Sequence, residues 1–191
     1  MEDLNRVTSV LDELLGKSDL STATAEGSKS GDLPDGYYLC EVEKAELTAS
    51  KSSGNPMVKL QYKVVENGFK SVIDDQGNDI LVEAKGTANR KIFLNYVLST
   101  EQQVGFFVSD MLKFANPDDM SKPLLGDTPE EAKAYFKSSA LLVDALDIIS
   151  MGCRIYIMVQ TVAKKDNPEE KDKKYNPITW SRAVKLELPT L

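Results

Sequence analysis

Cationic and flat aromatic side chains occupy alternate positions in two apolar stretches of this 191-residue chain. Lys59 and Lys63 alternate with the apolar residues of 58–64, and Lys91 and Phe93 alternate with those of 91–98. A period of two predicts strands that have one buried face and one open face. Lysines contact phosphates and flat rings stack on bases, which is the chemistry of single-stranded nucleic-acid binding. The structural alternative is a covering helix that buries Phe93.

The candidate binding residues extend beyond these two stretches into two loops and two later strands. Lys51 lies in the turn-rich loop 50–56, and the loop 163–175 carries further lysines among acidic residues. Tyr156 is an additional candidate ring, with burial as the alternative. Trp180 is another, although its phase with Ile178 and Val184 favours burial over stacking. The full predicted set is Lys51, Lys59, Lys63, Arg90, Lys91, Phe93, Arg154, Tyr156, Lys164, Lys165, Lys173, Lys174, Trp180 and Arg182.

The elements that must position these residues are five strand-like segments, with a helical block between the third and the fourth. The strands are expected at 36–47, 58–64, 91–98, 153–162 and 175–186. This order is typical of the oligonucleotide-binding (OB) fold, a five-stranded barrel that binds through one face and two loops. We therefore expect a mainly β protein with helical insertions, built on an OB-fold-like barrel.

Local signals predict one irregularity in the first strand and three helices in the helical block. The apolar phase shifts by one residue at Ala45, which predicts a β-bulge in the first strand. Ser99–Gln102 has capping-box spacing, and Thr128–Glu131 combines a cap with a proline at the first helical position. The apolar stretch 141–151 is expected to form a helix that stops at Gly152.

The first 35 residues differ from the rest of the chain in charge and composition. Apolar residues recur at helical spacing in 2–16, and a small, polar, glycine-containing stretch follows at 20–36. Residues 1–36 hold eight acids and three bases, so they carry −5 of the chain's net −7. We expect an acidic amphipathic helix and a flexible linker in 1–35, and the binding domain in 36–191. The helix is a candidate for contacts between copies of the chain, and docking on its own domain is the alternative.

The composition argues against several classes of site. The chain has no histidine, so the commonest general base and the commonest zinc ligand are missing. Cys40 and Cys153 lie in apolar alternation and are expected to be buried thiols. The acids around Gly77 miss the spacing of a calcium loop, so a plain acidic turn is expected there. No apolar run is long enough for a membrane span. We expect a cytoplasmic protein with no cofactor, metal or membrane partner.

Four short pieces of sequence follow one another between residues 36 and 187. They are GYYLCEVEKAELTASKSSGNPMVKLQYKVVENG, KIFLNYVLS, GCRIYIMV and YNPITW. The first is similar to the G-x-Y … S-G-N-P-M … V pattern of phage-encoded single-stranded DNA-binding proteins with an OB fold, and the others fall in that family's order. The resemblance implies non-hydrolytic binding of single-stranded DNA during phage replication or recombination, in the host cytoplasm. Replication or recombination proteins are the further partners that it implies.

Two other classes of function stay open at this point. The net charge of −7 fits an acidic protein-binding module, or a DNA mimic that inhibits or recruits a host protein. A metal-dependent hydrolase would need clustered carboxylates, and Asp74, Asp75 and Asp79 form the compact set in this chain. We expect no enzymatic activity, and largely sequence-independent binding of single-stranded DNA is the leading hypothesis.

Overall fold

The computed structural model describes residues 33–115 and 125–179. The chain separates into two units, Met1–Asp32 and Leu33–Leu191. The predicted amphipathic helix at 2–16 and most of its linker lie outside the described residues. None of the described helices is long and apolar enough to cross a membrane.

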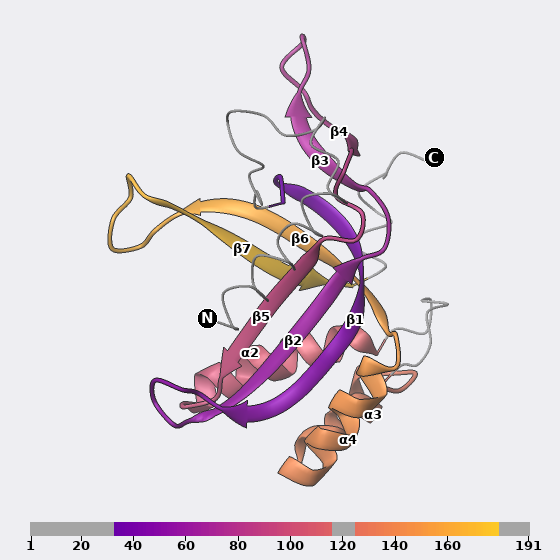
Figure 1. The fold of residues 1–191 in the computed structure, drawn as a ribbon, viewed down its shortest axis with the longest axis vertical. Coiled ribbons are helices and arrows are strands. Elements are labelled where there is room, and N and C mark those ends of the chain that lie inside the picture. The colour runs from indigo at the N-terminus through magenta and orange to yellow at the C-terminus, as the bar shows by residue number, and fades with distance from the viewer. Residues whose placement is uncertain (1–32, 116–124, 180–191) are drawn as a thin grey trace, which may run out of the picture. The chain divides into compact units, whose positions relative to one another are not determined.

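Within the described residues of the second unit, seven strands form one antiparallel sheet (Figure 1). In chain order they are β1 (Gly36–Ala49), β2 (Pro56–Val64), β3 (Gly68–Ile73), β4 (Asp79–Ala84), β5 (Lys91–Val97), β6 (Arg154–Ala163) and β7 (Lys171–Ile178). The hydrogen-bonded order is β4-β3-β1-β2-β5, and β6 pairs with both β1 and β7. The prediction of a mainly β protein with helical insertions is confirmed.

The long strand β1 connects the two halves of the sheet. Its first residues pair with β6, and residues from Cys40 onward pair with β2. The register with β2 shifts between Val42 and Lys44, which leaves Glu43 as the extra residue of a β-bulge. The predicted bulge is therefore confirmed, and it lets one strand bend and serve both halves.

The sheet is open, so the predicted closed barrel is not formed by the part of the chain that the structure describes. Closure would require β5 to pair with β7, but β5 pairs with β2 and β7 pairs with β6. The helix α2 (Glu101–Met111) instead packs against both β5 and β7. Lys113, just beyond that helix, donates a hydrogen bond to the carbonyl of Pro177 at 2.7 Å. The contacts of α2 therefore link β5 and β7 where a direct strand pairing was expected.

The β3–β4 hairpin is an insertion that the alternation pattern did not predict. It separates β2 from β5 along the chain, and Asn67 lies between β2 and β3. The side-chain Oδ1 of Asn67 accepts hydrogen bonds from the backbone N–H groups of Thr87 and Ala88, which ties the two ends of the insertion together. At the hairpin tip, the Asp74 carboxylate accepts from its own turn's backbone. No group of ligands suitable for a metal exists among the described residues.

The helical block begins where the capping signals predicted. It comprises α2, a 3-10 turn η2 (Leu112–Phe114), α3 (Pro129–Lys133), a 3-10 turn η3 (Ala134–Phe136) and α4 (Ser139–Ser150). The hydroxyl of Thr100 accepts from the Gln103 backbone N–H, and that of Thr128 accepts from Glu131. Each cap satisfies a backbone donor that would otherwise lack a partner at the first turn.

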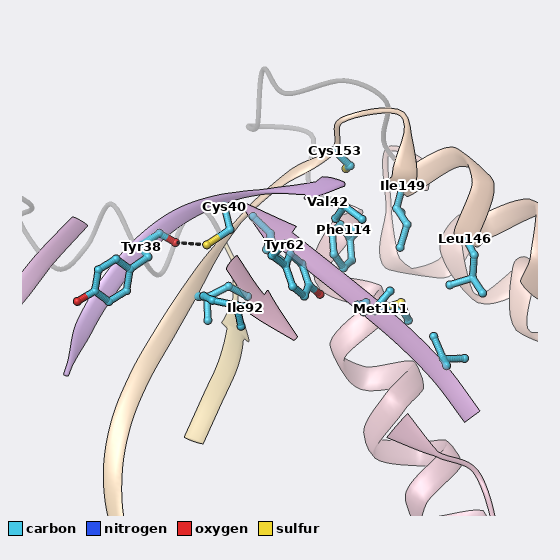
Figure 2. Packing of buried hydrophobic residues seen from close by; sticks show 14 of the residues in the cluster. Tyr38, Cys40, Val42, Tyr62, Ile92, Met111, Phe114, Leu146, Ile149 and Cys153 are labelled. Atoms are coloured by element: carbon cyan, nitrogen blue, oxygen red, sulfur yellow. Dashed lines mark hydrogen bonds between the residues drawn. The ribbon is translucent and has the colours of Figure 1, made fainter. Parts of the chain in front are cut away.

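The core lies between the sheet and the helices (Figure 2). Tyr38, Cys40 and Val42 of β1 point into it, as do Tyr62 of β2 and Ile92 of β5. Against them pack Met111 and Phe114, together with Leu146 and Ile149 of α4. Cys40 and Cys153 are buried and unbridged, as predicted. Because the helices cover this inner face, the opposite face of β1, β2 and β5 is left open to solvent.

Candidate nucleic-acid interface

The outer face is the surface formed by the side chains of β1, β2 and β5 that point away from the helices. Those side chains are Glu41, Glu43, Lys44, Glu46, Lys59, Gln61, Lys63, Lys91, Phe93 and Asn95. Strand register places them in rows: Glu46 opposite Lys59 and Asn95, Lys44 opposite Gln61 and Phe93, and Glu41 opposite Lys63 and Lys91. The predicted binding residues Lys59, Lys63 and Lys91 therefore lie on the same face as Phe93, in the rows on either side of it.

Phe93 is the bare ring of the outer face. It is 62% exposed, although an apolar side chain of this size is usually covered. It lines a shallow hollow of about 320 Å³, together with Lys44, Lys59, Gln61 and Asn95 among others. The alternative that a helix covers Phe93 is therefore wrong. An exposed ring beside amide and ammonium groups has the chemistry needed to stack one base and hold its backbone.

Some lysines of the outer face form ion pairs with its glutamates and others do not. Lys91 forms an ion pair with Glu43 at 3.0 Å, and Lys44 forms one with Glu46 at 2.6 Å. Within the described residues, Lys59 and Lys63 form no ion pair; both are half-buried. Four lysines against three glutamates leave the outer face at +1, so it is far from strongly basic. The positive part follows β2 and β5, whereas β1 contributes all three carboxylates.

The glutamates of β1 were the residues that the sequence analysis missed at this site. Glu43 accepts hydrogen bonds from Gln61 and Lys91, and these hold the pKa of its carboxyl below its usual range. The hydrogen bond from Lys44 does the same for Glu46. Both carboxylates are therefore ionised at neutral pH. These glutamates could have been predicted by continuing the alternation of inward and outward side chains along β1 past the bulge.

The predicted loop residues lie at the margins of the sheet. Lys51 is exposed in the β1–β2 loop, and Lys165 is exposed in the β6–β7 loop. Lys164 is paired with Glu170 at 2.6 Å. In Figure 1 both loops project toward the left of the view, away from α3 and α4. These lysines are accessible, but they are not adjacent in sequence or pairing to the Phe93 row.

Three further predicted residues are engaged with the protein itself. Lys173 of β7 forms a hydrogen-bonded ion pair with Asp35 at 2.5 Å. Arg154 of β6 pairs with Glu41 at 3.1 Å and remains exposed. Arg90, before β5, donates from Nε to the Gly86 carbonyl at 3.1 Å. The exposed Lys174 lies opposite Gln160 on the β6–β7 hairpin.

Tyr156 is a correction to the predicted set, because its ring is buried. It is 8% exposed and packs with Ile178, with Tyr37, Leu39 and Met158 around them. This second small apolar cluster explains the burial, which the sequence analysis had weighed as the alternative. Trp180 and Arg182 lie outside the described residues. Phe93 is thus the exposed candidate ring within the described part of the chain.

The comparisons with known proteins add a family of unknown function. A family model described as "Protein of unknown function (DUF669)" matches residues 20–103. The match includes all of β1, β2 and β5, and hence the outer face, and ends at the start of α2. No curated protein was found to match the chain. The family's description names no ligand or reaction, so the functional case depends on the outer face.

Proposed function

We propose that this chain is a non-catalytic single-stranded DNA-binding protein whose outer face holds the strand largely independently of sequence. The observation that carries the proposal is Phe93, exposed on β5 and adjacent to a row containing Lys59 of β2, which forms no ion pair with the described residues. Lys63, which also forms no ion pair in the part of the chain that the structure describes, adds a second cation on the same strand face. A ring and two available ammonium groups supply the two kinds of contact that single-strand binders combine.

The strand connectivity supports an open variant of the OB fold. β1, β2, β5, β6 and β7 follow the OB order, with helices between the third and fourth of these strands and β3–β4 as an insertion. β1 pairs with the second and the fourth, as in that fold, while the closing pair is missing. OB folds bind oligonucleotides on strands 2 and 3 and through the 1–2 and 4–5 loops. In this chain those parts are the β2–β5 face and the loops that carry Lys51, Lys164 and Lys165.

The expected affinity of one copy is modest. One stacked base contributes roughly 1–3 kcal/mol, and each phosphate contact steepens the dependence of log affinity on log salt by about 0.7. With one exposed ring and a net charge of +1 on the outer face, micromolar or weaker binding follows at moderate salt. Coverage of a long strand would then need neighbouring copies. We place the acidic leader, residues 1–35, as the candidate contact between them.

The cellular role that we propose is phage DNA replication or recombination in the host cytoplasm. It depends on the resemblance of residues 36–187 to phage single-stranded DNA-binding proteins. Partners among replication or recombination proteins follow from the same resemblance. The absence of histidine from the whole sequence agrees with a protein that binds without cleaving.

The test is a triple substitution on the outer face, Phe93→Ala with Lys59→Ala and Lys63→Ala. We expect oligo-dT binding to weaken roughly tenfold or more, from the lost stack and two phosphate contacts. The matched control changes one exposed phenylalanine and two exposed lysines of the helical block: Phe106→Ala, Lys133→Ala and Lys137→Ala. Circular dichroism and a urea melt check that both variants are folded.

Three results would count against the proposal in different ways. A folded triple variant that binds oligo-dT as tightly as the wild type would refute the site. A wild-type chain that binds no oligo-dT at low salt would refute the function. Release of cleavage products from labelled DNA with Mg²⁺ or Mn²⁺ would refute the non-catalytic assignment.

A further inference from the structure

Glu43 has an unusual position on the outer face because it is the extra residue of the β1 bulge. Without a residue directly opposite it on β2, its side chain reaches across the neighbouring strands. Its Oε2 accepts a hydrogen bond from Gln61 Nε2 of β2 at 2.7 Å and an ion-paired contact from Lys91 Nζ of β5 at 3.0 Å. Three strands thus converge on one carboxylate oxygen.

The two donors that converge on Glu43, Gln61 Nε2 and Lys91 Nζ, form a small oxyanion-binding site. An amide N–H and an ammonium group are both donors, and neither has a lone pair to repel an anion. Lys63 adds attraction from the same side, because its charge also helps to lower the pKa of Glu43. A phosphodiester oxygen carries the same kind of negative charge as the carboxylate oxygen and accepts from the same donors.

This oxyanion-binding site lies beside the exposed ring of Phe93. Gln61 is the cross-strand partner of Phe93, and Lys91 precedes Phe93 by two positions on the same face of β5. Two residues along a strand span about 6.6 Å, so one nucleotide can reach both the ring and the oxyanion-binding site. A base stacked on Phe93 would bring its own phosphate, or the next, to Gln61 and Lys91.

We propose that Gln61 and Lys91 form a DNA phosphate subsite, and that Glu43 occupies this subsite as an internal phosphate mimic in the free protein. This inference rests on the proposed function of the outer face. Binding then requires Glu43 to rotate away as a phosphate takes its place. The side chains of Glu43 and Lys91 are 27% and 49% exposed, and ion pairs at such exposed positions are weak, so the exchange is feasible.

The exchange has a consequence for affinity. Glu43 competes for the two donors and, once displaced, remains a negative charge close to the bound phosphate. It therefore weakens binding and favours release, which a protein that must leave its strand during replication or recombination needs. Removing the charge of Glu43 should tighten binding and free Lys91 for one more phosphate contact.

The test compares Glu43→Gln with Glu130→Gln in the full chain. Glu130 is an exposed glutamate of α3 that is also paired with a lysine, Lys133, at 3.5 Å, so the control removes an equivalent charge away from the outer face. We expect oligo-dT binding by Glu43→Gln to be roughly three- to tenfold tighter than wild type. Its log–log salt slope should steepen by about 0.7, the value for one added phosphate contact. Glu130→Gln should match the wild type.

A double-mutant cycle separates the subsite from a general charge effect. In a Lys91→Ala background, Glu43→Gln should tighten binding clearly less than it does in the wild type, because the Lys91 contact that it frees has been removed and only the Gln61 contact and the lost repulsion remain. A wild-type chain that binds oligo-dT while Glu43→Gln binds no tighter than Glu130→Gln would overturn the subsite and leave the function intact. An equal gain with and without Lys91 would overturn it as well. Failure of every variant and of the wild type to bind would instead overturn the function.

Discussion

Truncation of Phe93 alone gives the sharpest single-residue prediction. A base–aromatic stack contributes about 1–3 kcal/mol, so Phe93→Ala should weaken oligo-dT binding by about 5- to 140-fold. The cost to folding should be much smaller than for a core phenylalanine, because 62% of the residue is already exposed. The covered 38% of a ring that can bury about 150–250 Å² contributes about 1.4–2.4 kcal/mol at about 25 cal/mol per Å².

The chain offers a closely matched control for this substitution. Phe106 on α2 is also 62% exposed, so Phe106→Ala removes the same side chain at the same exposure from the helical block. We expect Phe106→Ala to bind oligo-dT within about twofold of the wild type, since surface changes away from a site have small effects. Fluorescence anisotropy with a labelled dT oligomer at fixed low salt measures both affinities, and Phe93→Trp should retain binding because its ring also stacks.

The comparison has a definite refuting result. If Phe93→Ala and Phe106→Ala bind equally well and both are folded, Phe93 does not stack on a base. Equal weakening of both variants would indicate that exposed apolar surface in general, rather than the outer face, contacts the ligand.

Two predictions concern stability. Gly68→Ala should destabilise the fold by roughly 3 kcal/mol in a urea melt, because a Cβ there would lie 2.1 Å from Cδ1 of Tyr38. Gly105→Ala, with nothing within 4 Å, should stabilise α2 by roughly 0.5–1 kcal/mol, and a similar loss in both variants would contradict the packing account. Burial raises the pKa of Asp35, but hydrogen bonds, foremost from Lys173, bring it below the ordinary 3.8. The advantage of wild type over Asp35→Asn should therefore be full at neutral pH and shrink as the pH falls below about 4, and a pH-independent difference in free energy of unfolding would contradict this.

Features set by local chemistry were predictable from the sequence. Thr128 was recognised as a helix cap, and the start of α2 was predicted to within one residue of its cap Thr100, because a cap needs only a hydroxyl and the backbone three residues ahead. The bulge at Glu43 followed from a one-residue shift of apolar phase, and the exposure of Phe93 from strict alternation along β5. Each of these depends on neighbours within a few residues.

Features set by contacts between distant segments were not predictable in the same way. Open sheet edges follow from α2 packing against β5 and β7, which no local pattern encodes. Tyr156 alternates as an outward residue, yet Ile178 of β7 and its neighbours bury it on that side of the sheet. The carboxylates of β1 were not among the predicted site residues, because only the register with β2 shows that Glu43 reaches Gln61.

The measurement that tests the central claim most directly is an NMR titration of the isotope-labelled full chain with a dT oligomer at low salt. The account predicts saturable shifts that are largest on β2 and β5, at the backbone of Lys59 and Phe93 and at the side-chain amide of Gln61. Saturable shifts confined to the helical block, or no saturable shifts at all, would contradict it.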